Sequence, residues 1–144
     1  THLGFYTISM LSNIPNLVYL APTCKEEYLA MLDWGVDQDK YPVVISMPGN
    51  GVHPAKYPVA SSYDSLNEYQ VCEKEEEVAV LALGDFFQLG EEAARSIEKE
   101  TGKKVTLINP RFASGLDEKL LSDLEENHLT KELIMKDVMK LLHA

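Results

Sequence analysis

The histidines are the side chains of this sequence best suited to proton transfer, because an imidazole titrates near neutral pH. The chain contains four of them: His2, His53, His128 and His143. None has a cysteine or a carboxylate at the spacing of a zinc-binding motif, so the sequence predicts no metal site. Considered by residue type and spacing alone, all four are expected to be exposed or structural.

The two cysteines, Cys24 and Cys72, are too few for a disulfide framework in a chain of this length. Their spacing also fits no metal-binding motif. The sequence therefore predicts two reduced thiols, which is typical of a cytoplasmic protein.

Three loop positions could contact an anionic ligand. Gly84 and Asp85 lie where a strand is expected to turn into a helix, and a helix N-terminus can bind an anion. The Asp85 carboxylate would occupy the same N–H groups, so a plain helix cap is favoured. The turn at residues 48–51 lacks the lysine of a phosphate-binding loop. Arg111 follows a strand, where α/β proteins place ligands, although it could equally pair with a nearby acid.

The first of two strand–helix–strand patterns lies in the front part of the chain. The apolar run 17–21 predicts a strand that ends at Pro22. Thr23 with Glu26 three residues later is a capping box, which predicts the start of a helix. Residues 42–45 predict a second strand, and such βαβ units form parallel sheets. The helix is expected to bury an apolar stripe at helical spacing, namely Tyr28, Leu29, Leu32 and Val36.

The same pattern returns in the rear part. Residues 78–83 predict a strand buried on both faces, followed by a helix capped by Asp85 with Gln88 as the reciprocal partner. Gly102 is expected to end this helix, and residues 105–108 predict the next strand. The buried stripe of the helix is expected at Phe86, Leu89, Ala93 and Ile97. Two more helices are predicted, one from Asp117 that buries Leu120, Leu121 and Leu124, and one from Thr130 that buries Ile134, Val138, Leu141 and Leu142.

The fold class predicted from these patterns is α/β, with two partial parallel-sheet domains in series. Residues 53–77 show no sustained period, and long structureless loops are uncommon inside one domain, so this segment is interpreted as an interdomain linker. The domains then cover residues 1–52 and 78–144. About two strands each is too few for a complete sheet, so both domains are expected to be incomplete.

The composition and charge of the chain limit the kinds of molecule that it is expected to bind. Of 144 residues, 45% are hydrophobic and 25% are charged, which is typical of a globular protein and excludes a disordered chain. The formal charge of −10 disfavours nucleic acid and anionic membrane surfaces as partners. No stretch approaches the roughly 20 apolar residues that span a bilayer. The chain begins at Thr1 without a secretory leader, so it is expected to be a piece of a longer cytoplasmic protein.

Several segments, taken in order, resemble the transketolase family and, within it, the 1-deoxy-D-xylulose-5-phosphate synthases. Those similar to the pyrimidine-binding domain are residues 1–6 (THLGFY), 11–17 (LSNIPNL), 21–23 (APT) and 42–48. Those similar to the C-terminal domain are residues 78–84, 109–112 (NPRF) and 116–118 (LDE). The resemblance covers nearly the whole chain and identifies 1–52 as the end of the first domain and 78–144 as the second.

The resemblance implies a thiamine-diphosphate-dependent transferase that also uses magnesium. Such an enzyme condenses pyruvate with glyceraldehyde 3-phosphate to 1-deoxy-D-xylulose 5-phosphate, an isoprenoid precursor. By its motif, His2 would lie beside the reacting carbon, where a histidine can transfer a proton or hydrogen-bond a developing oxyanion. The resemblance places no cofactor-binding or metal-binding residue within this chain. It implies small-molecule substrates, a homodimer of the full-length protein and no activity for this piece alone.

Three departures from the family leave other functions open. Ser46 stands where the family has an arginine that grips the substrate phosphate, and Thr7 stands where it often has aspartate. Compared with the family, the sequence also lacks a strand–helix–strand near Glu125. The alternatives are a non-catalytic relative that acts as an assembly or regulatory module, and the beta subunit of a 2-oxoacid dehydrogenase.

Overall fold

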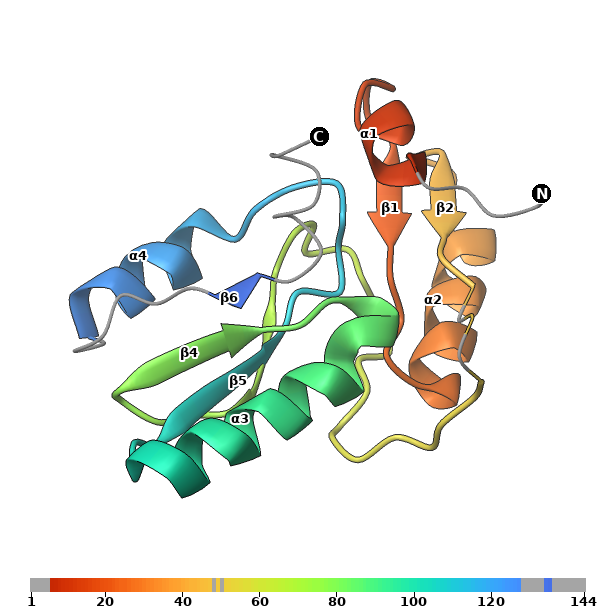
Figure 1. Cartoon of the computed structure of the whole chain (residues 1–144). Helices are drawn as coiled ribbons and strands as arrows, with labels where there is room; N and C mark the ends of the chain where they lie inside the picture. The colour runs from red at the N-terminus through yellow and green to blue at the C-terminus, as the bar shows by residue number, and fades with distance from the viewer. Residues whose placement is uncertain (1–5, 48, 50, 128–133, 136–144) are drawn as a thin grey trace.

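The computed structural model describes residues 6–47, 49, 51–127 and 134–135. Among these residues, no helix is both long and apolar enough to cross a membrane. The elements, in chain order, are α1 (Thr7–Leu11), β1 (Val18–Leu20), α2 (Lys25–Asp37), β2 (Val43–Ile45), β3 (Gln70–Glu73), β4 (Val78–Leu81), the 3₁₀ turn η1 (Gly84–Phe86), α3 (Phe87–Thr101), β5 (Val105–Asn109), α4 (Glu118–Asn127) and β6 (Ile134–Met135). The chain is α/β, as the sequence predicted (Figure 1).

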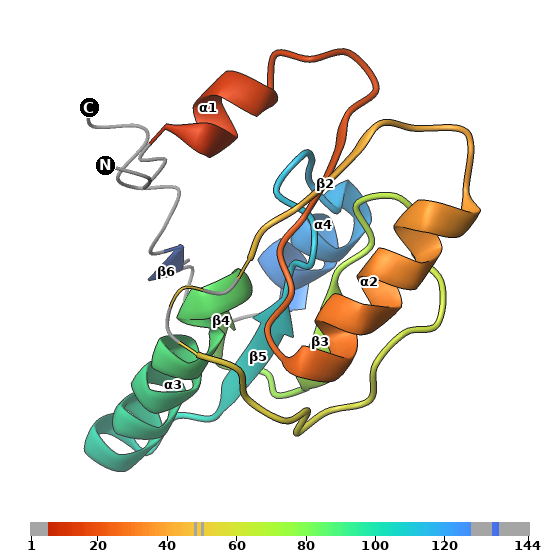
Figure 2. The same cartoon turned by 90° about the vertical axis from the view of Figure 1, so that its right-hand side faces the viewer.

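The front part of the chain forms the predicted βαβ unit. Strands β1 and β2 pair in parallel, with Val18 opposite Val43, and α2 is the crossover between them (Figure 2). The predicted buried stripe of α2 is wrong. Leu29, Leu32 and Val36 are 46%, 40% and 76% exposed.

Helix α2 is instead turned so that a different face is buried, made of Glu27, Met31 and Trp34. Trp34 packs edge-on against Tyr63 at 6.1 Å between ring centroids, and its indole Nε1 donates a hydrogen bond to Asp64. A large aromatic side chain buries more area than a leucine, so Trp34 decides which face of the helix turns inward.

The rear part forms a four-stranded sheet in the order β3-β5-β4-β6. Strands β4 and β5 pair in parallel, as predicted, and β3 pairs antiparallel with β5. Strand β3 lies inside the segment 53–77 that was expected to be a linker. Its four residues, Gln70-Val71-Cys72-Glu73, are at most half-buried, so they carry no clear apolar alternation for a sequence pattern to show.

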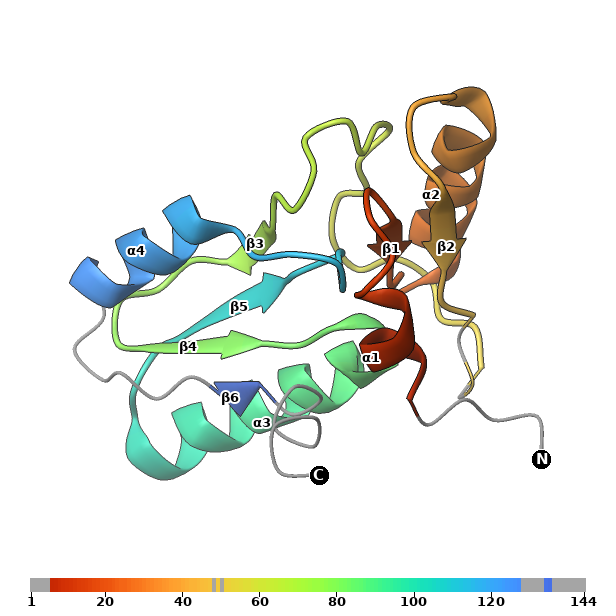
Figure 3. The same ribbon diagram turned by 90° about the horizontal axis from the view of Figure 1, so that it is seen from above.

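Two helices cover the opposite faces of this sheet (Figure 3). The predicted buried stripe of α3 is shifted by one residue at its start, because Phe87, Gly90 and Ala94 are buried, whereas Phe86 and Leu89 are partly exposed. Ile97 packs against the core, as predicted. The buried face predicted for the next helix is confirmed in α4, which packs Leu120, Leu121 and Leu124 against the sheet. Two predicted helix ends are also confirmed. The Asp117 carboxylate accepts a hydrogen bond from the Leu120 N–H at the start of α4. Gly102 ends α3 with a left-handed φ of 72°.

Asp85 does not cap α3, contrary to the prediction. Helix α3 begins at Phe87 without a side-chain cap. The Asp85 carboxylate instead accepts a 2.6 Å hydrogen bond from the Gly49 N–H, 36 residues earlier in the chain. A long-range partner for the carboxylate has replaced the local one.

The helix predicted from Thr130 is wrong at Ile134 and Met135, which form β6 and pair in parallel with Val80 and Leu81 of β4. Its other expected residues, including Val138, Leu141 and Leu142, lie outside the described residues.

The two parts of the chain are joined by backbone pairing as well as by sequence. Leu20 at the end of β1 forms an antiparallel bridge with Phe112, just beyond β5. On either side of this bridge, Ala21 N–H donates to the Arg111 carbonyl and Ala113 N–H donates to the Tyr19 carbonyl, each at 2.8 Å. Phe112 also belongs to the hydrophobic core around β1 and α2.

Candidate functional site

The carboxyl ends of β1 and β5 meet at the first turn of α2, and Glu27 lies at that meeting point. Glu27 is 2% exposed. Its Oε2 accepts hydrogen bonds from the N–H and the hydroxyl of Thr23, both at 2.8 Å. Asn109 Nδ2 at the end of β5 donates to Oε1 and Oε2 at 3.0 and 3.2 Å. We call these three residues the Glu27 junction, because they connect the two parts of the chain through buried polar groups.

Sequence patterns assigned the start of α2 to the wrong pair of residues. The N-cap is Cys24 rather than Thr23, and its Sγ accepts from the Glu27 N–H at 3.4 Å. The carboxylate that bonds back to the start of the helix is Glu27 rather than Glu26, and it accepts from the N–H of Thr23, one residue before the N-cap. Neither Glu27 nor Asn109 was singled out from the sequence; the signal was a carboxylate on the buried face of a helix and an amide directly after an apolar strand.

Both cysteines are free, in agreement with the predicted reduced thiols. Burial raises the pKa of Cys24 above its usual value, and the nearby Glu27 carboxylate acts in the same direction. Burial likewise raises the pKa of Cys72 to about 12. The reactive form of a cysteine is its thiolate, so neither thiol is suited to act as a nucleophile near neutral pH.

Among the described residues, the Arg111 side chain contacts a backbone carbonyl and an aromatic ring rather than an acid. Its guanidinium donates to the Glu68 carbonyl, from Nε at 3.1 Å and from Nη2 at 2.5 Å, and lies 5.7 Å from the centroid of the Tyr63 ring. The residue has a left-handed φ of 62°, and its N–H donates to Asn109 Oδ1. Arg111 thus fixes the loop after β5.

Two cavities adjoin these elements. An apolar cavity of about 410 Å³ lies between the end of β4, helix α3 and the loop after β5. A second, of about 300 Å³, lies beside the start of α2 and has charged walls that include Lys25, Asp85 and Glu92. Within the described ranges, no group of three or more histidine, cysteine or acidic side chains could hold a metal ion.

The predicted catalytic residue, His2, lies outside the described residues, as do His128 and His143. His53 is half-buried, and its backbone carbonyl accepts from the Lys25 N–H at 2.9 Å. The structure therefore describes one of the four histidines, and His53 also lines the second cavity.

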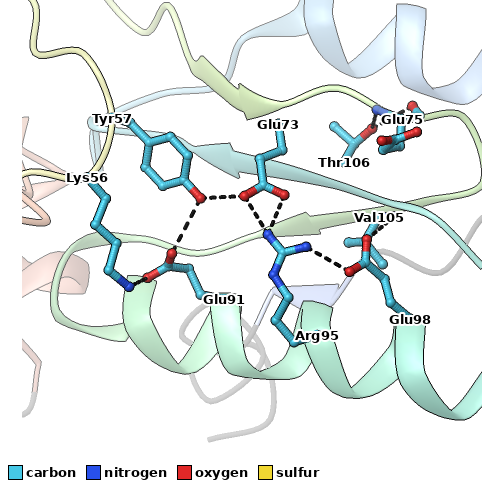
Figure 4. Close-up of polar contacts among 9 residues, drawn as sticks. All are labelled: Lys56, Tyr57, Glu73, Glu75, Glu91, Arg95, Glu98, Val105 and Thr106. Atoms are coloured by element: carbon cyan, nitrogen blue, oxygen red, sulfur yellow. Dashed lines mark hydrogen bonds and ion pairs between the residues drawn. The ribbon is translucent and has the colours of Figure 1, made fainter.

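A polar network attaches the segment before β3 to helix α3 (Figure 4). The Tyr57 hydroxyl donates to Glu73 at 2.5 Å and lies 3.3 Å from Glu91. The Arg95 guanidinium contacts both oxygens of Glu73 and also donates to Glu98 at 2.7 Å. Glu73 thus connects the linker, β3 and α3.

The Arg95–Glu73 pair makes stability depend on pH. Hydrogen bonds from Arg95, and then from Tyr57, lower the pKa of Glu73 below its usual value. Protonation of Glu73 therefore favours the unfolded chain. The stabilisation is complete above the unfolded pKa of about 4.3 and is lost as the pH falls through the folded value.

We expect Arg95→Gln to lower the free energy of unfolding by about 1 kcal/mol at pH 7 and by much less at an acidic pH below the lowered pKa of Glu73. Urea unfolding at both pH values measures this. Lys56→Gln is the control, because Lys56 pairs with Glu91 while 63% exposed and should have a smaller effect at pH 7. An equal loss for Arg95→Gln at both pH values would contradict the assignment.

Comparison with solved structures identifies the class of fold. A chain described as "Split gene transketolase, inactive beta4 tetramer" matches with a TM-score of 0.76 at 19% identity, covering 88% of this chain and 41% of that one. A transketolase from Leishmania mexicana matches with a TM-score of 0.63 at 16% identity, covering 85% and 17%. The chain therefore has the α/β fold of transketolases.

Sequence comparison is more specific. A 1-deoxy-D-xylulose-5-phosphate synthase from Shouchella clausii is 31% identical over 141 residues, which cover 97% of this chain and 22% of the relative. One from Lachnoclostridium phytofermentans is 31% identical over 137 residues, covering 89% and 20%. No family model matches the chain. The chain belongs to the transketolase family and is similar to its 1-deoxy-D-xylulose-5-phosphate synthases, which confirms the resemblance; it spans about a fifth of the length of these relatives.

Proposed function

We propose that this chain is part of a thiamine-diphosphate-dependent transferase that condenses pyruvate with glyceraldehyde 3-phosphate to 1-deoxy-D-xylulose 5-phosphate. The observation that carries the proposal is the similarity to synthases of that name along 97% of the chain. Because the chain spans about a fifth of those relatives, the activity is assigned to the whole protein and not to this chain alone. Residues 1–52 would end the pyrimidine-binding domain, 53–77 would be the linker and 78–144 would belong to the C-terminal domain.

The apolar cavity does not fit the diphosphate of the cofactor. No basic side chain is among the described residues that line the apolar cavity, so it offers nothing to a diphosphate. We therefore place the binding of thiamine diphosphate and magnesium on residues outside this chain. When bound there, the cofactor would supply the electron sink, and the protein would supply orientation and charge.

His2 would act on the substrate rather than hold the cofactor. By its motif, we assign it to proton transfer, or to a hydrogen bond to an oxygen that becomes negative in the transition state. The whole protein is expected to be a cytoplasmic homodimer that acts on small molecules.

A second candidate, a non-catalytic assembly or regulatory module, rests on Ser46. This residue follows β2, and its N–H donates to the Leu20 carbonyl at 2.8 Å, so it lies at the carboxyl ends of both strands of the first sheet. That edge is where α/β sheets place ligands. A serine there offers no charged fork to a phosphate. Thr7 is the other departure that supports this candidate. A beta subunit of a 2-oxoacid dehydrogenase has no comparable support, since the relatives compared here are named as synthases and transketolases.

The deciding experiment uses the whole protein with pyruvate, glyceraldehyde 3-phosphate and magnesium, with and without thiamine diphosphate. Mass spectrometry measures the product, and calorimetry measures binding of the cofactor. Product that requires the cofactor and decreases in a His2→Ala variant supports the transferase. Cofactor binding without product supports the non-catalytic module, and Ser46→Arg then tests whether the missing arginine explains the loss. Absence of both binding and product would contradict the transferase.

A further inference from the structure

The apolar cavity at the end of β4 is open and uncharged. Its walls come from α1, β4, α3 and the loop after β5, and none of the described side chains that line it is charged. Three of its apolar residues are also exposed: Phe86 by 39%, Leu89 by 37% and Leu116 by 59%. Contiguous exposed apolar surface of this kind usually marks a site that another apolar surface covers.

The direction of β6 shows which part of the chain approaches this cavity. Met135 pairs with Leu81 in a parallel arrangement. The two residues that follow Leu81 at the end of β4, Ala82 and Leu83, line the cavity. Because parallel strands run the same way, the direction of β6, continued beyond Met135, leads to the cavity.

The sequence beyond Met135 has the apolar pattern that such a site requires. Residues 136–144 read KDVMKLLHA. Val138, Leu141 and Leu142 stand at the i, i+3 and i+4 spacing of one helical face, and the charged residues Lys136, Asp137 and Lys140 lie off that face. Nine residues in a helix would be about 13 Å long, which suits a cavity that lies between the end of β4, helix α3 and the loop after β5.

We propose that residues 136–144 of this chain dock their apolar face into this cavity, so that it is an internal docking site and not a binding site for a small molecule. Two observations favour residues 136–144 as the occupant. Strand β6 ends beside the cavity, and the apolar pattern of these residues matches the uncharged cavity walls. This proposal does not depend on the proposed function.

Trypsin cleavage of the Lys140–Leu141 bond tests the proposal on the full chain. We expect this bond to be protected, and Leu89→Glu, which puts a charge in the cavity wall, to speed its cleavage at least about tenfold. Cleavage after Lys40, which is exposed in a loop between α2 and β2, serves as the internal reference and should not change. Leu32→Glu is the matched control, because Leu32 is 40% exposed on α2, does not line the cavity and should leave Lys140 protected.

A second variant keeps the test independent of changes to the cavity wall. Leu141→Ser combined with Leu142→Ser should open the cavity and increase the fluorescence of 1-anilinonaphthalene-8-sulfonate severalfold, whereas Asp137→Ser combined with His143→Ser should not. The proposal is overturned if Lys140 is cleaved as fast as Lys40 in the unmodified chain. It is also overturned if protection increases with chain concentration, which would assign the cavity to a second copy.

Discussion

Glu27→Ala should lower the free energy of unfolding by about 3 kcal/mol or more, since it leaves several buried donors without an acceptor. The Glu27 carboxylate accepts from the backbone N–H and hydroxyl of Thr23 and from the amide of Asn109. These donors lie at the contact between α2 and the end of β5. The loss should therefore affect the joining of the two parts of the chain as well as the local helix.

The neighbouring residue provides the control for this prediction. Glu26 lies on the same turn, is exposed, and accepts one hydrogen bond, from the Ala55 N–H at 2.7 Å. Glu26→Ala should cost less than about 1 kcal/mol. Glu27→Gln keeps the shape but turns a donor toward Asn109, so an intermediate loss is expected. Chemical unfolding followed by Trp34 fluorescence measures all three, and equal losses at positions 26 and 27 would refute the role of the junction.

Gly90→Ala is expected to destabilise the chain by about 2 kcal/mol or more, although alanine is the better helix former. A Cβ built at Gly90 would lie 2.3 Å from the Cβ of Ala82, closer than two such atoms can approach. The methyl group would force α3 away from the residues that follow β4. The expected loss is therefore steric and should outweigh the gain of about 1 kcal/mol in helix propensity.

The swap of the two residues tests this interpretation. In Ala82→Gly combined with Gly90→Ala, the methyl group moves from the sheet to the helix and the contact is relieved. We expect the double variant to recover most of the stability lost by Gly90→Ala, which a double-mutant cycle of unfolding free energies would detect as a coupling of about 2 kcal/mol. Gly35→Ala is the control, because its Cβ would lie 3.4 Å from Val43 Cγ1, an ordinary contact. Additive effects in the cycle would contradict the steric argument.

The predicted strands and helices were found where apolar periodicity was continuous. Both βαβ units could be predicted because apolar runs such as 78–83 are continuous and helix boundaries carry Gly102 and Asp117. The buried face was predicted for α4 but not for α2 or α3. In α3 the doublet Phe86-Phe87 permits two registers, and the contact between Gly90 and Ala82, which sequence spacing does not show, selects the second.

The candidate site was harder to predict because its polar groups pair over long distances in the sequence. Glu27 and Asn109 are 82 residues apart, and Asp85 and Gly49 are 36 apart. Local patterns assign such side chains to nearby caps, as they did for Asp85. By contrast, the family could be predicted, because its motifs follow one another along the sequence and can be recognised without knowledge of three-dimensional contacts.

The bridge between Leu20 and Phe112 has a consequence for how the chain folds. The two residues are 92 positions apart (112 − 20). Closing such a long loop costs more conformational entropy than closing a short one, although the cost grows slowly with length, and proteins rich in distant pairings fold slowly. The helical crossover between β1 and β2 and the one between β4 and β5 close much shorter loops. Each half should therefore acquire structure early, and their union through this bridge should be the slow, late event that completes the native state.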